Sequence, residues 1–248
     1  MDPDALGPSS WPEVEPWTPA HQAVEINEYE TLSMLLDAGA DPDEVFFELT
    51  LLTHAIDMEG DSHLQSGHPL HTAGTAIVLA YGADPRLPAA SGRTPLQIAE
   101  YYGHEPATRL LQRFFTPAEA PGRARGMGRG SFVEVESWTP VHRAVEMSDY
   151  ETLTALLDSG ADPDEVCFGH TLLTHAIDLE GDGHLQTNYP LNTASTAILL
   201  AYGADPRLPA IDGETPPADR RVLPPRTDQT AAPALPRPHT GWPPRERT

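Results

Sequence analysis

The chain has 248 residues, of which 39% are hydrophobic, and 37 Asp and Glu residues outweigh 15 basic ones to give a formal charge of -22. A field of that sign repels nucleic acid and anionic membranes, so we expect neither as a partner, and it favours basic proteins or cations. The single cysteine, Cys167, excludes an internal disulfide, and no run of about 18 apolar residues predicts a membrane span. With no leader-like segment after Met1, we expect a cytoplasmic protein.

The N-terminal part of the chain leads into a helix-starting motif. Residues 1–16 are rich in Pro and acidic side chains and are predicted to be flexible. Trp17 then opens a first repeat over residues 17–49. Thr18 is a natural N-cap, and Pro19 suits the first helical position, where its missing N–H would have no partner anyway.

Each repeat is predicted to contain two short helices, because apolar residues recur at helical spacing and a Gly-Ala-Asp-Pro turn follows. In the first repeat the second helix covers residues 29–38. In the second repeat, residues 50–93, Thr50 caps a first helix, residues 60–71 form a polar loop, and an apolar helix ends at Gly82. Helices this short are stable only when they stack on neighbouring repeats.

The pattern of repeats indicates two tandem modules. A third repeat at residues 94–115 lacks the Gly-Ala-Asp-Pro turn and is predicted to cap module 1, residues 17–115. The Pro, Gly and Arg of residues 116–131 predict a flexible linker. Residues 132–215 then restart the pattern 121 residues later, with roughly seven positions in ten identical, as module 2. Its repeats cover residues 138–170 and 171–215.

Module 2 breaks off before a third repeat. After Thr215 and Pro216, the Leu-Gln-Ile-Ala of module 1 is replaced by a Pro- and Arg-rich sequence, and residues 216–248 are predicted to be disordered. The missing cap is predicted to expose the apolar side of the helix at residues 196–202. We expect fraying, self-association or docking of a partner protein there.

These motifs together resemble the ankyrin repeat. They are Thr94-Pro95-Leu96 with Ala99, Thr18-Pro19 with His21 and Ala23, and the Gly-Ala-Asp-Pro turns that begin at residues 39, 82, 160 and 203. The Glu-Gly-Asp-x-His-Leu-Gln segment also looks like ankyrin proteins of high-GC bacteria. The resemblance implies an all-α solenoid of short antiparallel helix pairs whose concave surface and turn tips bind another protein, without catalysis and without a cofactor.

Candidate partner-binding residues come from the turn tips, many of them at positions where the two modules differ. In module 1 they are Asp43, Glu44, Phe46, Glu48, Leu49, Arg86, Ala90, Ser91 and Arg93. In module 2 they are Asp164, Glu165, Cys167, His170, Arg207, Ile211 and Glu214. Neutral drift of exposed loops is the alternative explanation of the differences. The acidic charge predicts a partner protein with a basic patch.

A few of these side chains have more than one interpretation. Cys167 replaces Phe46 of the first module, which favours a small apolar filler over a reactive thiol. Trp17 and Trp138 either cover the open ends of the two stacks or serve as exposed binding anchors.

One repeated group of side chains suggests chemistry. Its members are His54, Asp57, Glu59, Asp61 and His63, with His175, Asp178, Glu180, Asp182 and His184 in the second copy. Such ligands suit a divalent ion, whose bound water could make the protein a metal-dependent hydrolase. In the competing interpretation, which we favour, His54 bonds the neighbouring repeat, the carboxylates are solvated, and Asp61 or Asp182 caps a turn. We therefore predict no metal site and no enzymatic activity.

Overall fold

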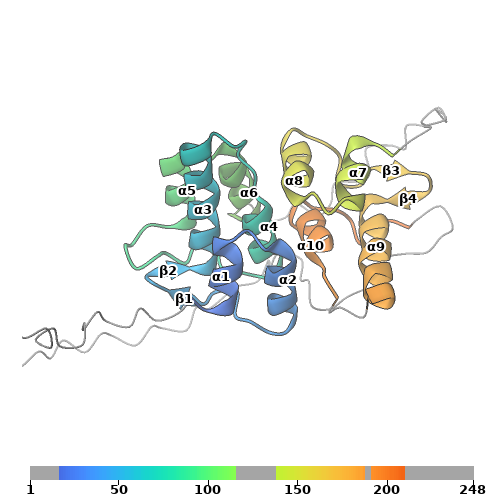
Figure 1. Ribbon diagram of the computed structural model, residues 1–248. Coiled ribbons are helices and arrows are strands. Elements are labelled where there is room, and N and C mark those ends of the chain that lie inside the picture. Colours follow the sequence, from blue (N-terminus) through green and yellow to red (C-terminus); the bar gives the residue numbers. More distant parts are fainter. Residues whose placement is uncertain (1–16, 116–137, 188–190, 210–248) are drawn as a thin grey trace, which may run out of the picture.

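The computed structural model describes residues 17–115, 138–187 and 191–209, which form helix pairs joined by turns and two small hairpins (Figure 1). The predicted flexible N-terminus, the linker, the first residues of module 2 and the tail lie outside the described residues. Module 1 contains α1 (Pro19–Glu25), α2 (Tyr29–Asp37), β1 (Val45–Phe46), β2 (Leu49–Thr50), α3 (Leu51–Ser66), α4 (Ala73–Ala80), α5 (Pro95–Tyr102) and α6 (Glu105–Phe115). Module 2 contains α7 (Pro140–Glu146), α8 (Tyr150–Asp158), β3 (Val166–Cys167), β4 (His170–Thr171), α9 (Leu172–Thr187) and α10 (Ala194–Ala201).

Threonine side chains start the first helix of each repeat, as the sequence predicts. The hydroxyl of Thr18 accepts the backbone N–H of His21 at 3.2 Å, and that of Thr50 accepts the N–H of Thr53 at 3.1 Å. At Thr94 the cap is reciprocal, because the Gln97 side chain also accepts the Thr94 N–H. These bonds satisfy N–H groups that have no partner inside the helix.

The helix ends also follow the sequence. Gly39 and Gly82 follow the second helices with φ of 99° and 94°, and Gly160 and Gly203 repeat this in module 2. Positive φ costs glycine little because it has no Cβ, so the chain can reverse immediately after the helix.

One sequence-based expectation is wrong: the segment at residues 60–71 is not a loop throughout. Helix α3 runs for 16 residues through Gly60 and ends at Gly67, which has φ of 70°. A Cβ built on Gly60 would lie 2.3 Å from Cγ of Tyr102, so the glycine is the place where α5 packs closely on α3. Helix α9 also continues through its glycine, Gly181, where a Cβ would meet nothing within 4 Å, so the helix does not require this contact. Asp61 consequently lies inside the helix, where its carboxylate accepts the Gln65 side chain, and caps no turn.

The third repeat of module 1 covers α3 through specific contacts from α5 and the start of α6. Besides its ring contact with Gly60, Tyr102 donates its hydroxyl to Asp57 Oδ1 at 2.7 Å. His104 donates Nε2–H to the carbonyl of His71 at 3.0 Å, while its Nδ1 accepts the backbone N–H of Ala107. The imidazole also lies 3.5 Å from the buried carboxylate of Glu59. These contacts close one end of the stack.

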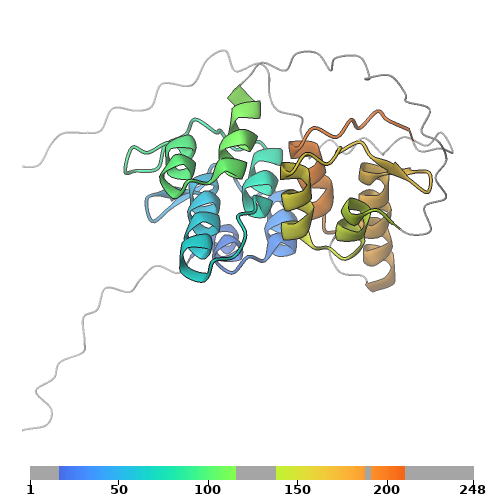
Figure 2. The same ribbon diagram turned by 90° about the horizontal axis from the view of Figure 1, so that it is seen from above.

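The two modules pack against each other through their second helices. Helix α10 lies along α4, and α2 and α8 flank this pair, so α1 and α3 lie on the far side of one module and α7 and α9 on the far side of the other (Figures 1 and 2). Helices α4 and α10 are the same segment in the two sequence copies, 121 residues apart. The same surface of each module therefore contributes to the interface, as in a two-fold symmetric dimer.

Reciprocal contacts support this symmetry. Thr72 Oγ1 lies 2.5 Å from the hydroxyl of Tyr202, and the equivalent atoms of Thr193 and Tyr81 lie 2.6 Å apart. Tyr29 packs edge-on against its own counterpart Tyr150, with ring centroids 5.9 Å apart. A residue meets its counterpart only near a symmetry axis, so Tyr29 and Tyr150 mark the local two-fold.

The interface buries helix α10, which the sequence predicted to be exposed. Of the α10 residues only Leu200 is half-buried, while the others are buried, because the helix packs on α4 of module 1. The prediction of an exposed apolar face at residues 196–202 is therefore wrong. Within the described residues the two copies differ at α9 instead, where Ile177 is half-buried although its counterpart Ile56 is fully buried.

Candidate interaction surface

The β1–β2 hairpin projects from the start of α3 and carries an unusual tip. Phe47 and Glu48 form its two-residue turn, with φ of 44° and 68°. Positive φ at both positions is the signature of the turn that suits hairpin twist, but it is normally supplied by Asn and Gly. Phe47 is 52% exposed and Val45 beside it is 59% exposed. The tip thus holds a partly exposed aromatic side chain, which packs edge-on against Trp17 with ring centroids 5.6 Å apart, on a strained backbone.

Module 2 repeats this tip, with a glycine that relieves the backbone strain at one of the two turn positions. Phe168 is 58% exposed with φ of 49°, and Gly169 occupies the position of Glu48 with φ of 91°. Val166 is 50% exposed, like Val45 in the first copy. Figure 1 shows the β1–β2 and β3–β4 hairpins on opposite sides of the molecule, so the two tips form two separate surfaces.

Behind each tip, a tryptophan packs on a pair of histidine rings. Trp17 stacks on His54 with centroids 4.9 Å apart, and the His21 and His54 Nδ1 atoms lie 2.9 Å apart. Trp138 stacks in the same way on His175, whose Nδ1 lies 3.1 Å from that of His142. Both tryptophans are half-buried and cover the rings. Each Nδ1 contact requires one ring to donate and the other to accept, so at least one ring of each pair is neutral.

Burial keeps these histidines neutral. It lowers the pKa of His21 to about 4, helped by repulsion from His54, and burial with repulsion from His175 does the same for His142. Burial also lowers the pKa of His54, although the Glu25 carboxylate, 3.1 Å from its Nε2, opposes that effect. The prediction that His54 bonds the adjoining repeat agrees with this geometry.

The turns next to the hairpins are joined by carboxylates that the sequence predicted as binding residues. Asp43 Oδ1 accepts the backbone N–H of Asp84 from the next turn at 2.7 Å, and Asp164 accepts that of Asp205 at the same distance. Burial raises the pKa of Asp43 and of Asp164. Glu44 accepts the hydroxyl of Thr18 at 2.6 Å. Asp43 and Asp164 therefore hold consecutive repeats together, and Glu44 stabilises the start of its own repeat.

The remaining predicted residues differ in their access to solvent. Exposed side chains are Glu48, Ala90, Ser91, Arg86, Arg93 and Arg207, and half-buried ones are Phe46, Leu49, Glu165 and His170. Cys167 is buried, consistent with a filler. Ile211 and Glu214 lie outside the described residues. In module 1 the backbone N–H of Ala90 donates to the carbonyl of Glu48 at 2.7 Å, so the hairpin tip and the following turn form one continuous surface.

Comparison of the two sequence copies did not identify the most exposed apolar residues of the hairpin tips. Phe47 and Phe168, like Val45 and Val166, are identical in the two modules, whereas the predicted set favoured positions that differ. The available signal was the alternation of apolar residues at positions 45 and 47 between an Asp-Pro turn and a capping Thr. One face of a two-stranded hairpin has no core to pack against.

The side chains of the alternative metal-binding interpretation do not converge. His54 contacts His21 and Glu25, Asp57 accepts the Tyr102 hydroxyl, and Glu59 accepts both the N–H and the hydroxyl of Thr75. His63 Nδ1 donates to the carbonyl of His68. Across the described residues, no three His, Cys, Asp or Glu side chains are placed to share a metal ion. The geometry therefore gives no support to a metal-dependent hydrolase.

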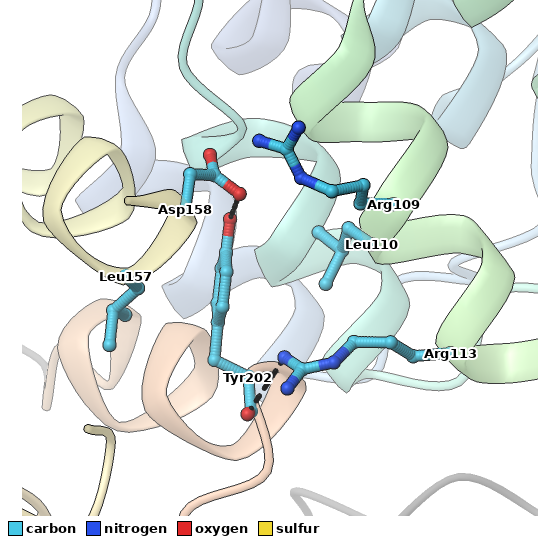
Figure 3. A pocket seen from close by; sticks show the side chains of 6 residues that line it. All are labelled: Arg109, Leu110, Arg113, Leu157, Asp158 and Tyr202. Carbon is cyan, nitrogen blue, oxygen red and sulfur yellow. Dashed lines mark hydrogen bonds between the residues drawn. The ribbon is translucent and has the colours of Figure 1, made fainter. Parts of the chain in front are cut away.

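A cavity of about 210 Å³ lies where α6 meets module 2 (Figure 3). Arg113 donates to the Tyr202 carbonyl at 2.9 Å, and the Tyr202 hydroxyl donates to Asp158 Oδ1 at 2.8 Å. Figure 3 shows the Arg109 guanidinium near the Asp158 carboxylate. Burial raises the pKa of Asp158, and the arginine acts against that rise. These charges tie the third repeat of module 1 to module 2.

A second cavity, of about 300 Å³, opens between α2 and module 2 and is lined in part by Glu180. The Glu180 carboxylate accepts the N–H and hydroxyl of Thr196 at 3.1 and 2.6 Å. Burial nevertheless raises its pKa to about 7. Its counterpart Glu59 has the imidazole of His104 close by, 3.5 Å from its carboxylate.

Helix pairs that begin at capped Thr, end at left-handed Gly and stack through their first helices define a helical repeat protein of the solenoid class. The chain belongs to the ankyrin repeat family, whose members are general protein-interaction modules. A model described as ankyrin repeats (3 copies) matches residues 71–167, and an ankyrin repeat model matches residues 17–45. No helix within the described ranges is long and apolar enough to cross a membrane.

Individual relatives are more distant. The human transient receptor potential cation channel subfamily A member 1 is 28% identical over 173 residues, which cover 60% of this chain and 15% of that protein. The chain thus spans a small part of the length of that curated relative. The ankyrin repeat domain of Bcl-3, a member of the IkappaB family, is 23% identical with a TM-score of 0.30, covering 80% of this chain and 77% of its own. The human ASB11 ankyrin repeat domain is 20% identical with a TM-score of 0.34, covering 80% and 90%.

Proposed function

We propose that this protein is a non-catalytic scaffold that binds a partner protein through its hairpin tips and the turns beside them. The observation that carries the proposal is the tip of β1–β2, where Phe47 is exposed on a left-handed backbone. Bulky residues rarely adopt positive φ, and such strain concentrates at functional sites. Exposed aromatic side chains are also the residues that most often anchor protein interfaces.

The charge around the tip defines the chemistry of the partner. Glu48 is exposed in the turn itself, and Glu44 and Asp41 lie in the preceding turn of a chain with net charge -22. An acidic rim around an apolar anchor complements a basic patch around an apolar pocket. Because exposed charges are screened by salt, affinity for such a partner falls as the ionic strength rises.

The test compares three immobilised full-length proteins as baits for a host lysate. Phe47→Ala with Phe168→Ala removes both aromatic tips. Ile26→Ala with Met147→Ala is the matched control, because these residues are also counterparts in the two modules and are 58% and 72% exposed. We expect a partner that the wild type and the control retain, that rising salt elutes, and that the double Phe variant retains about tenfold less.

Two results would contradict the proposal. Equal recovery of every retained protein by the wild type and the double Phe variant would exclude the tips as the binding surface. Retention that does not weaken with salt would exclude the basic partner. Circular dichroism of each variant establishes beforehand that the fold is intact.

A further inference from the structure

Helix α9 of module 2 repeats the face of α3 that carries the third repeat in module 1. Ile56, Asp57, Glu59 and Gly60 correspond to Ile177, Asp178, Glu180 and Gly181, and all four pairs are identical. We call the second set the α9 face. In module 1, Asp57 accepts a hydroxyl, Glu59 lies beside an imidazole, and Gly60 leaves room for an aromatic ring. The α9 face carries the same residue types.

The α9 face is open within the described part of the chain. A Cβ on Gly181 would meet nothing within 4 Å, whereas one on Gly60 would collide with Tyr102. Ile177 and Glu180 are half-buried and Asp178 is exposed, with its carboxylate 3.4 Å from Nδ1 of His170. Leu185, one helical turn after Gly181, is 80% exposed. The surface keeps the shape and the acceptors of a docking site.

The corresponding positions of module 2 do not carry the groups that fill the equivalent site in module 1. The positions of Tyr102 and His104 correspond, 121 residues later, to Leu223 and Pro225. Neither residue can donate a hydrogen bond from its side chain. The hydroxyl and imidazole donors of module 1 are therefore absent from the corresponding positions of module 2.

We propose that the α9 face docks a helix hairpin of another protein, one that carries a phenol and an imidazole at the spacing of Tyr102 and His104. In this complex the phenol ring of the partner lies on Gly181, and its hydroxyl donates to the Asp178 carboxylate. The imidazole N–H of the partner approaches the Glu180 carboxylate. Each of these contacts has its template in module 1. Donors from the partner meet carboxylate acceptors on α9, which makes the two surfaces complementary. This site is distinct from the hairpin tips and does not depend on them.

The probe is a fluorescein-labelled synthetic peptide of residues 94–115, titrated with the full-length protein and followed by fluorescence anisotropy. We expect saturable binding. Gly181→Val should weaken it by about tenfold or more, because the added side chain occupies the place of the ring. Gly183→Val is the matched control: it lies on the same helix, its Cβ would also meet nothing within 4 Å, and its counterpart Ser62 already carries a side chain. A peptide with Tyr102→Phe and His104→Ala should bind about as poorly.

A second measurement does not require the isolated peptide to fold on its own. In a full-length chimera, residues 95–115 replace residues 216–236, which supplies the hairpin within the chain. We expect a Tm at least about 5 °C above that of the parent, and we expect Gly181→Val to remove the gain while Gly183→Val keeps it. A gain in Tm without peptide binding still supports the docking surface.

Four results would overturn the proposal. The first is neither peptide binding nor a gain in Tm, and the second is equal binding by the Gly181→Val and wild-type proteins. The third is a lower Tm for Gly181→Val than for Gly183→Val in the parent chain, which would show that residues of the chain itself cover the face. The fourth is a dimer in light scattering that Gly181→Val converts to a monomer, which would make a second copy the occupant.

Discussion

At the scale of single residues, the paired histidines couple the stability of the stack to pH. His21 is buried, and its pKa of about 4 lies below the ordinary value of 6.5. Protonation therefore favours the unfolded chain, and stability is lost as the pH falls from 6.5 towards 4. His142 has the same lowered pKa in module 2. Glu180 acts oppositely, because its raised pKa removes stability as the pH rises through 7.

We predict that His21→Gln reduces this pH dependence. The wild type should lose about 2 kcal/mol more than the variant between pH 7 and pH 5, from the stated pKa values. Urea unfolding at the two pH values measures the difference, and comparing two proteins cancels the contribution of Glu180. A difference in stability that stays constant with pH would show that His21 titrates normally.

Gly60 and Gly181 are identical in sequence context but not in environment. Gly60→Ala should destabilise the protein by about 1–2 kcal/mol, because the methyl group collides with the ring of Tyr102. Gly181→Ala should stabilise it by up to about 1 kcal/mol through helix propensity, since no atom lies near. Thermal unfolding of the two variants checks the opposite signs. A loss of stability with both substitutions would mean that the α9 face is covered.

At the scale of elements, the two hairpins differ at one position of the turn. Glu48→Gly should stabilise the protein by about 0.5–1 kcal/mol, because glycine adopts positive φ without the strain that Glu48 carries at 68°. Module 2 already has Gly169 there, so Gly169→Glu should destabilise by a similar amount. Urea unfolding measures both. Unchanged stability in both variants would show that the tip is not strained.

Local sequence signals determine some of the helix boundaries but not all of them. Capping Thr residues and terminal Gly residues fix the starts of α1, α3 and α5 and the turns after α2 and α4. Gly60 was a misleading signal, because glycine has low helix propensity and yet α3 continues through it to the left-handed Gly67. Helix α9 continues through Gly181 in the same way without a contact like that of Tyr102.

At the scale of the whole molecule, the packing of α4 on α10 joins the two modules. Tyr81 and Tyr202 each bond a Thr of the opposite module, so replacing both removes one half-buried and one buried aromatic ring and two reciprocal hydrogen bonds. We predict that wild-type modules unfold together. Tyr81→Ala with Tyr202→Ala should destabilise the protein by several kcal/mol and uncouple them.

Single-tryptophan variants measure this coupling, because Trp17 reports on module 1 and Trp138 on module 2. Urea transitions followed by the two fluorophores should coincide when the interface is intact and separate when both tyrosines are replaced. Separate transitions in the otherwise unchanged protein would show that the modules are energetically independent, and coincident ones in the double Tyr variant would place the coupling elsewhere.

The sequence by itself determined the repeat family and the helix pairs, because caps, turn glycines and helical periodicity act within a few residues of each other. It also located His54 at a contact between repeats. Only the tertiary structure decided that α10 is buried, that α3 continues through Gly60, and that the exposed hairpin tips carry Phe47 and Phe168. The burial of α10 depends on contacts between residues far apart in the chain, because the spacing of residues along the sequence does not encode which surfaces two modules bury against each other.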